Sequence, residues 1–130
     1  MSTSPNSCFE EHRSAGSFDA TVRRLSDAIE GAGLTLFASI DHAANARQVG
    51  LAMPPATVLI YGNAKGGTPV MLDTPQSALD LPLRVLIQER DGAVIVVFHP
   101  VAVALGQAGV SEELASRLEP AQRLLVEALG

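Results

Sequence analysis

The sequence has few aromatic or basic residues and almost no cysteine. Aromatic residues make up 4% of its 130 residues, none of them is tryptophan, and Cys8 is the single cysteine. One cysteine cannot form an internal disulfide, so packing must stabilise the fold. Nine lysines and arginines stand against fourteen acidic residues, which gives a net charge of -5. The chain therefore has too few cations to bind duplex phosphates and too few aromatic rings to stack on single-stranded bases.

Long apolar runs are also missing. The most apolar stretch covers residues 93–98 and continues over 101–105, but Pro100 breaks it in the middle. A helix that spans a bilayer needs about 20 apolar residues without such a break. Residues 1–17 lack the basic start and the apolar segment of a secretory signal. We therefore expect a soluble, cytoplasmic protein that has neither a membrane nor a nucleic acid as its partner.

What the sequence does have is apolar content. Hydrophobic residues make up 47% and charged residues 18%, over a length typical of one domain. This composition excludes a chain that is disordered because of high charge and low hydrophobicity. We expect residues 1–16 to form a flexible tail, because they are polar, and residues 17–130 to form a single domain.

Helices are predicted from spacing and from capping residues. Ser17 is a natural N-cap for a first helix, in which apolar residues recur at helical spacing at Phe18, Val22, Leu25 and Ile29. Asp41 caps a short helix that runs to residue 49. Ser111 caps the final helix, and Pro120 should kink or restart that helix because proline removes an internal backbone donor.

Four strands are expected, and two of them should form a hairpin. Apolar and β-branched residues predict strands over residues 34–40, 56–61, 81–89 and 93–98. The dipeptide Asp91-Gly92 suits a tight turn between the last two strands. A hairpin requires antiparallel pairing, so the order of the elements predicts an α+β fold with a mixed or antiparallel sheet packed against helices.

A series of short motifs follows in a fixed order along the chain. These are Asp41-His42, Gly62-Asn63, Gly67-Thr68-Pro69, Asp80-Leu81-Pro82-Leu83 and Phe98-His99-Pro100. In these motifs and their order the chain resembles the family catalogued as domain of unknown function 302. The resemblance implies a small α+β domain whose curved sheet is gripped by helices, similar to the TATA-binding-protein-like folds. It implies no activity.

The glycine-rich segment over residues 62–67 is the first candidate site. Its glycines have the spacing of a phosphate loop, but Thr68 and Pro69 stand where that loop needs lysine and then serine or threonine. Nucleotide hydrolysis of that type is therefore excluded. We expect a loop leading into a helix capped by Thr68, whose free N–H groups favour an anion, with Lys65 adding a charge. Alternatively, the glycines serve backbone geometry alone.

Asp41 and His42 are candidate catalytic residues. The carboxylate could orient the imidazole for general-base chemistry, and His99 could complete a two-histidine, one-carboxylate set for zinc or ferrous iron. Alternatively, Asp41 is simply a helix cap and His99 a structural residue. Arg84 could bind a ligand carboxylate through its planar fork, or form a surface ion pair with Asp80 or Asp73.

The leading hypothesis is a domain that binds a small ligand or an anion without catalysis, cofactor or metal, in a pocket between the sheet and the helices. The residues expected to bind the ligand are His42, Gly62, Asn63, Lys65, Gly67, Thr68 and Arg84. Two alternatives stay open. One is an enzyme or metal-binding protein that uses Asp41, His42 and His99, and the other is a homodimeric interaction module.

Overall fold

The computed structural model of the chain describes residues 8–130 and contains a five-stranded sheet. The strand order is β1-β5-β4-β3-β2, and every neighbouring pair is antiparallel. The strands are β1 (Glu10–Ser14), β2 (Thr35–Asp41), β3 (Ala56–Gly62), β4 (Leu83–Arg90) and β5 (Ala93–Phe98). The predicted α+β class with an antiparallel sheet is confirmed. The likeness to TATA-binding-protein-like folds stays a prediction.

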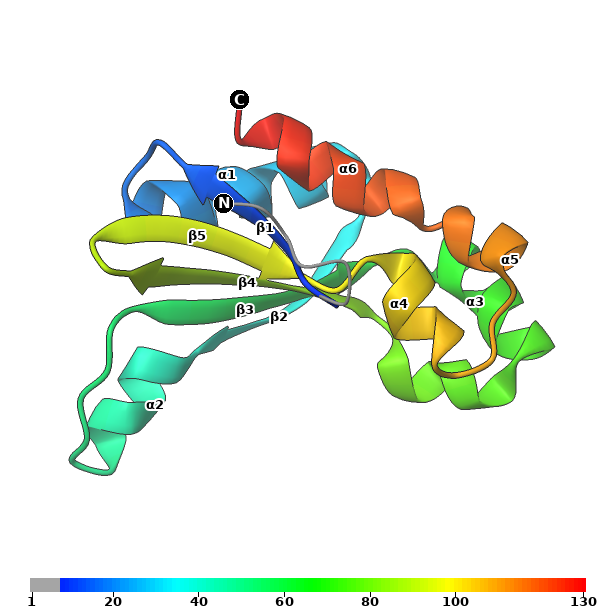
Figure 1. The fold of residues 1–130 in the computed structure, drawn as a ribbon, viewed down its shortest axis with the longest axis horizontal. Helices are drawn as coiled ribbons and strands as arrows, with labels where there is room; N and C mark the ends of the chain where they lie inside the picture. The colour runs from blue at the N-terminus through cyan, green and yellow to red at the C-terminus, as the bar shows by residue number, and fades with distance from the viewer. Residues whose placement is uncertain (1–7) are drawn as a thin grey trace.

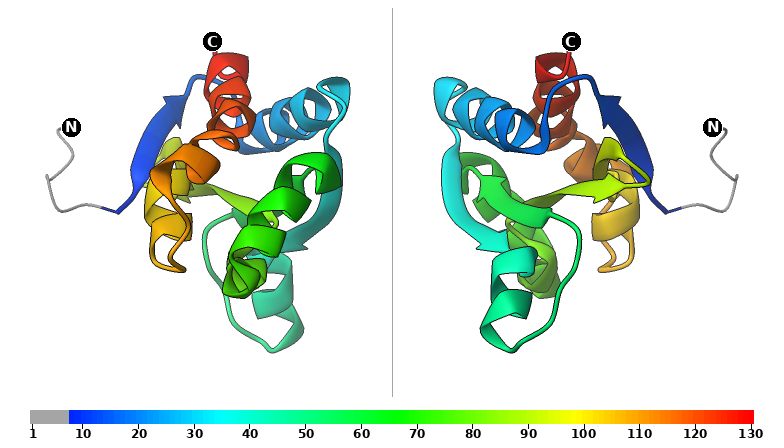
Figure 2. Two further views of the ribbon diagram at one scale, coloured as in Figure 1. Left: turned by 90° about the vertical axis from the view of Figure 1, so that its right-hand side faces the viewer. Right: turned by 90° about the vertical axis from the view of Figure 1, so that its left-hand side faces the viewer.

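The helices occupy three places around the sheet. Two of them, α1 (Phe18–Gly31) and α6 (Glu119–Ala128), lie together over one face (Figures 1 and 2). The short α2 (His42–Gln48) follows β2 and stands on the opposite side of the sheet (Figure 2). The others gather near one end of the sheet (Figure 1): α3 (Ala64–Asp73), the 3₁₀ helix η1 (Pro75–Asp80), α4 (Val101–Gly106) and α5 (Glu112–Ser116).

Local signals place α1 as predicted. Ser17 Oγ accepts a hydrogen bond from Ala20 N at 3.1 Å, which caps the helix. Of the predicted apolar stripe, Leu25 and Ile29 are fully buried, and the remaining two residues are partly buried against the same core. Tyr61 of β3 is buried in this core, and burial raises the pKa of its phenol above the ordinary value. The core therefore lies between α1, α6 and one face of the sheet.

The predicted hairpin and helix restart are confirmed. Asp91 and Gly92 between β4 and β5 have φ angles of 52° and 79°, the left-handed values that a two-residue hairpin turn of this kind requires. The final helical segment is divided: α5 ends at Ser116, and Pro120 is among the first residues of α6. Proline is tolerated there because the N–H groups of the first turn have no intrahelical partner.

β1 differs from the tail predicted over residues 1–16. Residues 1–7 lie outside the described residues, but Glu10–Ser14 pairs with β5 at the edge of the sheet, from Glu10 opposite Phe98 to Ser14 opposite Val94. The strand reads Glu-Glu-His-Arg-Ser and lacks the apolar alternation that marks a half-buried strand. Backbone pairing with β5 forms it instead, which a hydropathy pattern cannot reveal.

A polar cluster holds β1 against α6. Arg123 Nη2 donates to both carboxylate oxygens of Glu10 at 2.7 Å, and His12 Nε2 lies 2.6 Å from Glu10 Oε2. The Arg123 guanidinium also lies over the Phe98 ring, 5.8 Å from its centroid. Burial alone would raise the pKa of the Glu10 carboxyl, but hydrogen bonds and charges from Arg123 and His12 outweigh burial and hold this pKa below its ordinary value.

The Glu10 cluster predicts a stability that depends on pH. Because the folded-state pKa is lowered, the carboxylate stabilises the fold above the unfolded-state pKa, and this contribution is lost as pH falls through the folded-state value. We expect Glu10→Gln to lower the free energy of unfolding at pH 7 by on the order of 1 kcal/mol. The difference from wild type should shrink toward about pH 3.

Urea unfolding at several pH values measures this difference. Glu127→Gln serves as the control, since Glu127 is exposed and has no ion pair among residues 8–130. An unchanged pH dependence in Glu10→Gln would contradict the assignment.

Candidate functional site

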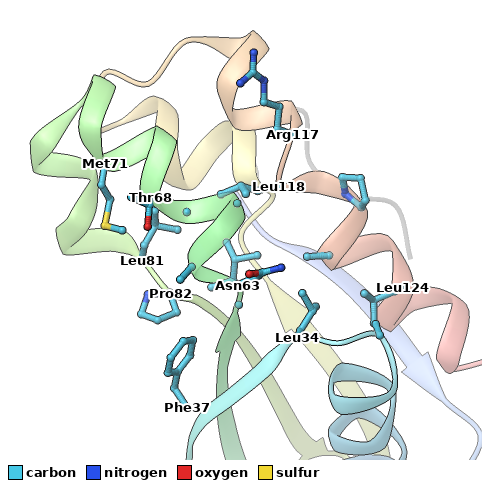
Figure 3. Close-up of a pocket in the computed structure, with 18 residues that line it drawn as sticks. Leu34, Phe37, Asn63, Thr68, Met71, Leu81, Pro82, Arg117, Leu118 and Leu124 are labelled. Atoms are coloured by element: carbon cyan, nitrogen blue, oxygen red, sulfur yellow. The ribbon is translucent and has the colours of Figure 1, made fainter.

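A cavity of about 450 Å³ opens beside α3, between the start of β2, the end of β3 and the start of α6. Its walls are mostly aliphatic and aromatic side chains from segments far apart in the sequence (Figure 3), among them Leu34, Phe37, Met71, Leu81, Leu118 and Leu124. We refer to this cavity as the α3 pocket. Its volume falls within the range of about 300–1,000 Å³ that is usual for small-molecule sites.

The helix α3 begins earlier than predicted. Its N-cap is Asn63 rather than Thr68: Asn63 Oδ1 accepts a hydrogen bond from Lys65 N at 2.9 Å. The N–H groups of Gly66 and Gly67 both donate to the Asn63 carbonyl oxygen, at 3.0 and 2.9 Å. The predicted loop is thus the first turn of α3. Pro69, which was expected to begin the helix, lies in its interior. Since these N–H groups are already bonded to Asn63, they are not free to hold the predicted anion.

Two glycines of α3 shape the pocket. A Cβ built on Gly66 would lie 3.2 Å from Leu118 Cδ2, closer than ordinary contact, so the segment before α6 packs on α3 where residue 66 has no side chain. A Cβ built on Gly67 would meet Leu81 Cδ1 and Met71 Cε at 3.9 Å each. Both of these side chains line the pocket, so a side chain at residue 67 would enter it.

The residues predicted to bind a ligand fall in three places. Four of them line the α3 pocket: Gly62, Asn63, Gly67 and Thr68. Lys65 and His42 are exposed and do not line it. Arg84 borders a separate cavity of about 90 Å³ that His99 also lines. The structure thus brings four of the seven residues to one cavity, and their contact with a ligand stays a prediction.

The residues proposed for a metal site or a general base are not brought together in the structure. Asp41 Oδ1 accepts a hydrogen bond from Ala44 N at 2.9 Å as the N-cap of α2, and His42 is exposed. His99 follows β5, which is three strand spacings from β2, or roughly 14 Å at the usual spacing. Within residues 8–130, no group of three or more His, Cys, Asp or Glu residues could hold a metal ion. The predicted set of two histidines and one carboxylate is therefore not formed.

His99 makes structural contacts instead. Its ring stacks on Phe9 with centroids 4.8 Å apart, and His99 Nδ1 donates to the Cys8 carbonyl oxygen at 2.9 Å. The buried Gln122 side chain donates to the His99 carbonyl oxygen at 2.8 Å and accepts from Val101 N at 3.0 Å. These bonds fix the connection from β5 to α4, a helix that the sequence did not predict.

One wall of the pocket could not be predicted from the sequence. This wall comes from the end of α5 and the start of α6 and comprises Arg117, Leu118, Pro120, Ala121 and Leu124. Apolar spacing places Leu118 on a buried face of the final helix, but no local signal shows that this face meets α3. Only the tertiary arrangement brings the two segments together.

The alternative of a homodimeric interaction module stays a prediction.

Comparison with known proteins supports the same fold. The family model described as "Domain of unknown function DUF302" matches residues 10–129. The crystal structure of the uncharacterized conserved protein DUF302 from Bacillus stearothermophilus superposes with a TM-score of 0.81. The superposition covers 94% of this chain and 95% of that one, at 14% sequence identity. At this identity the likeness shows the fold alone.

Curated relatives match a shorter segment. "Fluoride-specific ion channel FluC 1" of Brucella suis biovar 1 (strain 1330) and its namesake in Brucella abortus biovar 1 (strain 9-941) are each 38% identical to this chain over 73 residues. The match covers 56% of this chain but 28% and 27% of those proteins. The chain therefore spans about a quarter of the length of these relatives. In residues 8–130, no helix is long and apolar enough to cross a membrane.

The capping role of Asp41 predicts how its substitutions behave. Asp41→Ala removes the acceptor for Ala44 N and should lower the free energy of unfolding by about 1 kcal/mol. Asp41→Asn keeps an oxygen in the same place and should lower the free energy of unfolding by only about a few tenths of a kcal/mol. Urea unfolding of both variants measures the difference. An equal loss in the two variants would show that the carboxylate does more than cap α2.

Proposed function

The chain belongs to the DUF302 family, and we propose that it binds a small, mainly apolar molecule in the α3 pocket. The observation that supports this proposal is the pocket itself, a cavity of about 450 Å³ with an apolar wall and two uncharged polar side chains, Asn63 and Thr68. An apolar cavity with a few placed polar groups is the usual form of a small-molecule site.

The size and lining of the pocket suggest a moderate affinity. A ligand that buries about 200 Å² of apolar surface gains on the order of 5 kcal/mol from the hydrophobic effect. Lost translational and rotational freedom offsets part of that gain. We therefore expect dissociation constants of about a few tenths of a millimolar or weaker for simple apolar probes.

The lining favours binding over catalysis. Among the described residues, Arg117 is the one ionisable side chain that lines the pocket. General acid–base catalysis needs a group that exchanges a proton near neutral pH, such as histidine or a carboxylate, and arginine stays protonated throughout that range. The proposed role is therefore that of a binding domain.

Filling the pocket should abolish binding. In Gly67→Leu, the new side chain would enter the space between Leu81 and Met71. The helix should tolerate it, since leucine is a better helix former than glycine. Gly106→Leu is the matched control, because Gly106 lies in α4 and a Cβ there meets nothing within 4 Å.

Thermal unfolding with a panel of alkylbenzenes and aryl ketones measures binding. A ligand at 100 times its dissociation constant stabilises the fold by about 2.7 kcal/mol. We expect the midpoint to rise in wild type and in Gly106→Leu, and not in Gly67→Leu. Equal shifts in the two variants would place binding elsewhere, and a panel without any shift would refute the proposal.

The Brucella relatives support a second candidate function, a role in fluoride handling beside a channel. Two proteins named as fluoride-specific ion channels share a 73-residue segment with this chain at 38% identity. We propose that this domain contributes to fluoride tolerance together with a fluoride channel.

Growth of cells in sodium fluoride tests this second candidate. Cells that carry a fluoride channel, with and without this chain, would be compared over a range of fluoride concentrations. A shift of at least about twofold in the tolerated concentration is expected. Identical growth curves would remove the candidate.

A further inference from the structure

The side chain of Asn63 presents a hydrogen-bond donor to the α3 pocket. Its Oδ1 is held by the bond from Lys65 N at 2.9 Å, and this bond decides which end of the amide is oxygen. The other end, Nδ2, has no acceptor among residues 8–130. Figure 3 shows the side chain near the middle of the pocket, with its nitrogen on the side of Leu34 and Leu124. The Asn63 side chain is exposed, so this nitrogen is available to a ligand oxygen that enters the pocket.

The charges around the pocket disfavour an anionic ligand. The Arg117 side chain points away from Asn63 in Figure 3, and its Nη2 lies 3.7 Å from Glu113 Oε1. The chain as a whole carries a net charge of -5. A carboxylate among apolar side chains without a paired cation is strongly destabilised, because it loses its hydration and gains no compensating charge.

Building on the proposed function, we propose that the α3 pocket takes an uncharged apolar molecule with a carbonyl oxygen, which accepts a hydrogen bond from Asn63 Nδ2. The apolar part of the ligand lies against Leu34, Leu81 and Leu124. The Thr68 hydroxyl also lines the pocket and can donate to a second ligand oxygen or accept from a ligand donor. Asn63 is then the residue that determines specificity.

The substitution Asn63→Asp removes the Nδ2 donor and keeps the helix cap. Aspartate keeps an acceptor for Lys65 N and is as good an N-cap as asparagine, so α3 should remain folded. It replaces the Nδ2 donor by an oxygen that repels a carbonyl. Asn45→Asp is the matched control, because Asn45 is exposed on α2 and does not line the pocket.

Three probes of similar shape test the ligand class. They are 4-phenyl-2-butanone with a carbonyl, butylbenzene without polar atoms, and 3-phenylpropanoate with a carboxylate. NMR titration of the backbone amides gives their dissociation constants at pH 7. We expect Asn63→Asp to weaken ketone binding about tenfold, since the hydrogen bond is lost and repulsion replaces it. Butylbenzene should change by less than about twofold, and Asn45→Asp should match wild type for all probes.

The outcomes distinguish the inference from the proposed function. Equal ketone affinity in wild type and Asn63→Asp, with butylbenzene still bound, would overturn the inference and leave the pocket as an apolar binding site. Tightest binding of 3-phenylpropanoate, weakened by Arg117→Gln, would overturn it in favour of an anionic ligand. Failure of all three probes to bind would refute the proposed function and the inference together.

Discussion

The hydrogen bond from Lys65 N to Asn63 Oδ1 is the interaction on which the geometry of the site depends. It starts α3 directly after β3, so that the first turn of the helix lies at the end of the sheet. The same bond fixes the orientation of the Asn63 amide, and with it the donor that faces the α3 pocket. Asn63 thus connects β3 to α3, caps the helix and supplies one of the polar groups of the site.

The packing around that turn depends on the absence of two side chains. At residue 66 the missing Cβ lets Leu118 approach α3, and at residue 67 it leaves empty space between Leu81 and Met71. Glycine inside a helix costs roughly 1 kcal/mol relative to alanine. This fold tolerates two of them in the first turn of α3, and the result is a cavity rather than a filled core.

Elements set by local chemistry could be predicted from the sequence. The caps at Ser17 and Asp41 and the turn at Asp91-Gly92 each depend on a few neighbouring residues, and all three are present in the structure. β1 could not be predicted, because its polar residues join the sheet through backbone bonds to β5. At α3, the glycine content suggested a loop. The structure has a helix there instead, because the cap at Asn63 outweighs the low helix propensity of the glycines that follow. The wall around Leu118 needed the tertiary fold.

The most direct test is a crystal structure of the protein with 4-phenyl-2-butanone bound. We expect the phenyl ring in the α3 pocket, against Leu34, Leu81 and Leu124, with the carbonyl oxygen about 2.9 Å from Asn63 Nδ2. A ketone bound outside this pocket, or inside it with the oxygen turned away from Asn63, would refute the role of Asn63 as the donor.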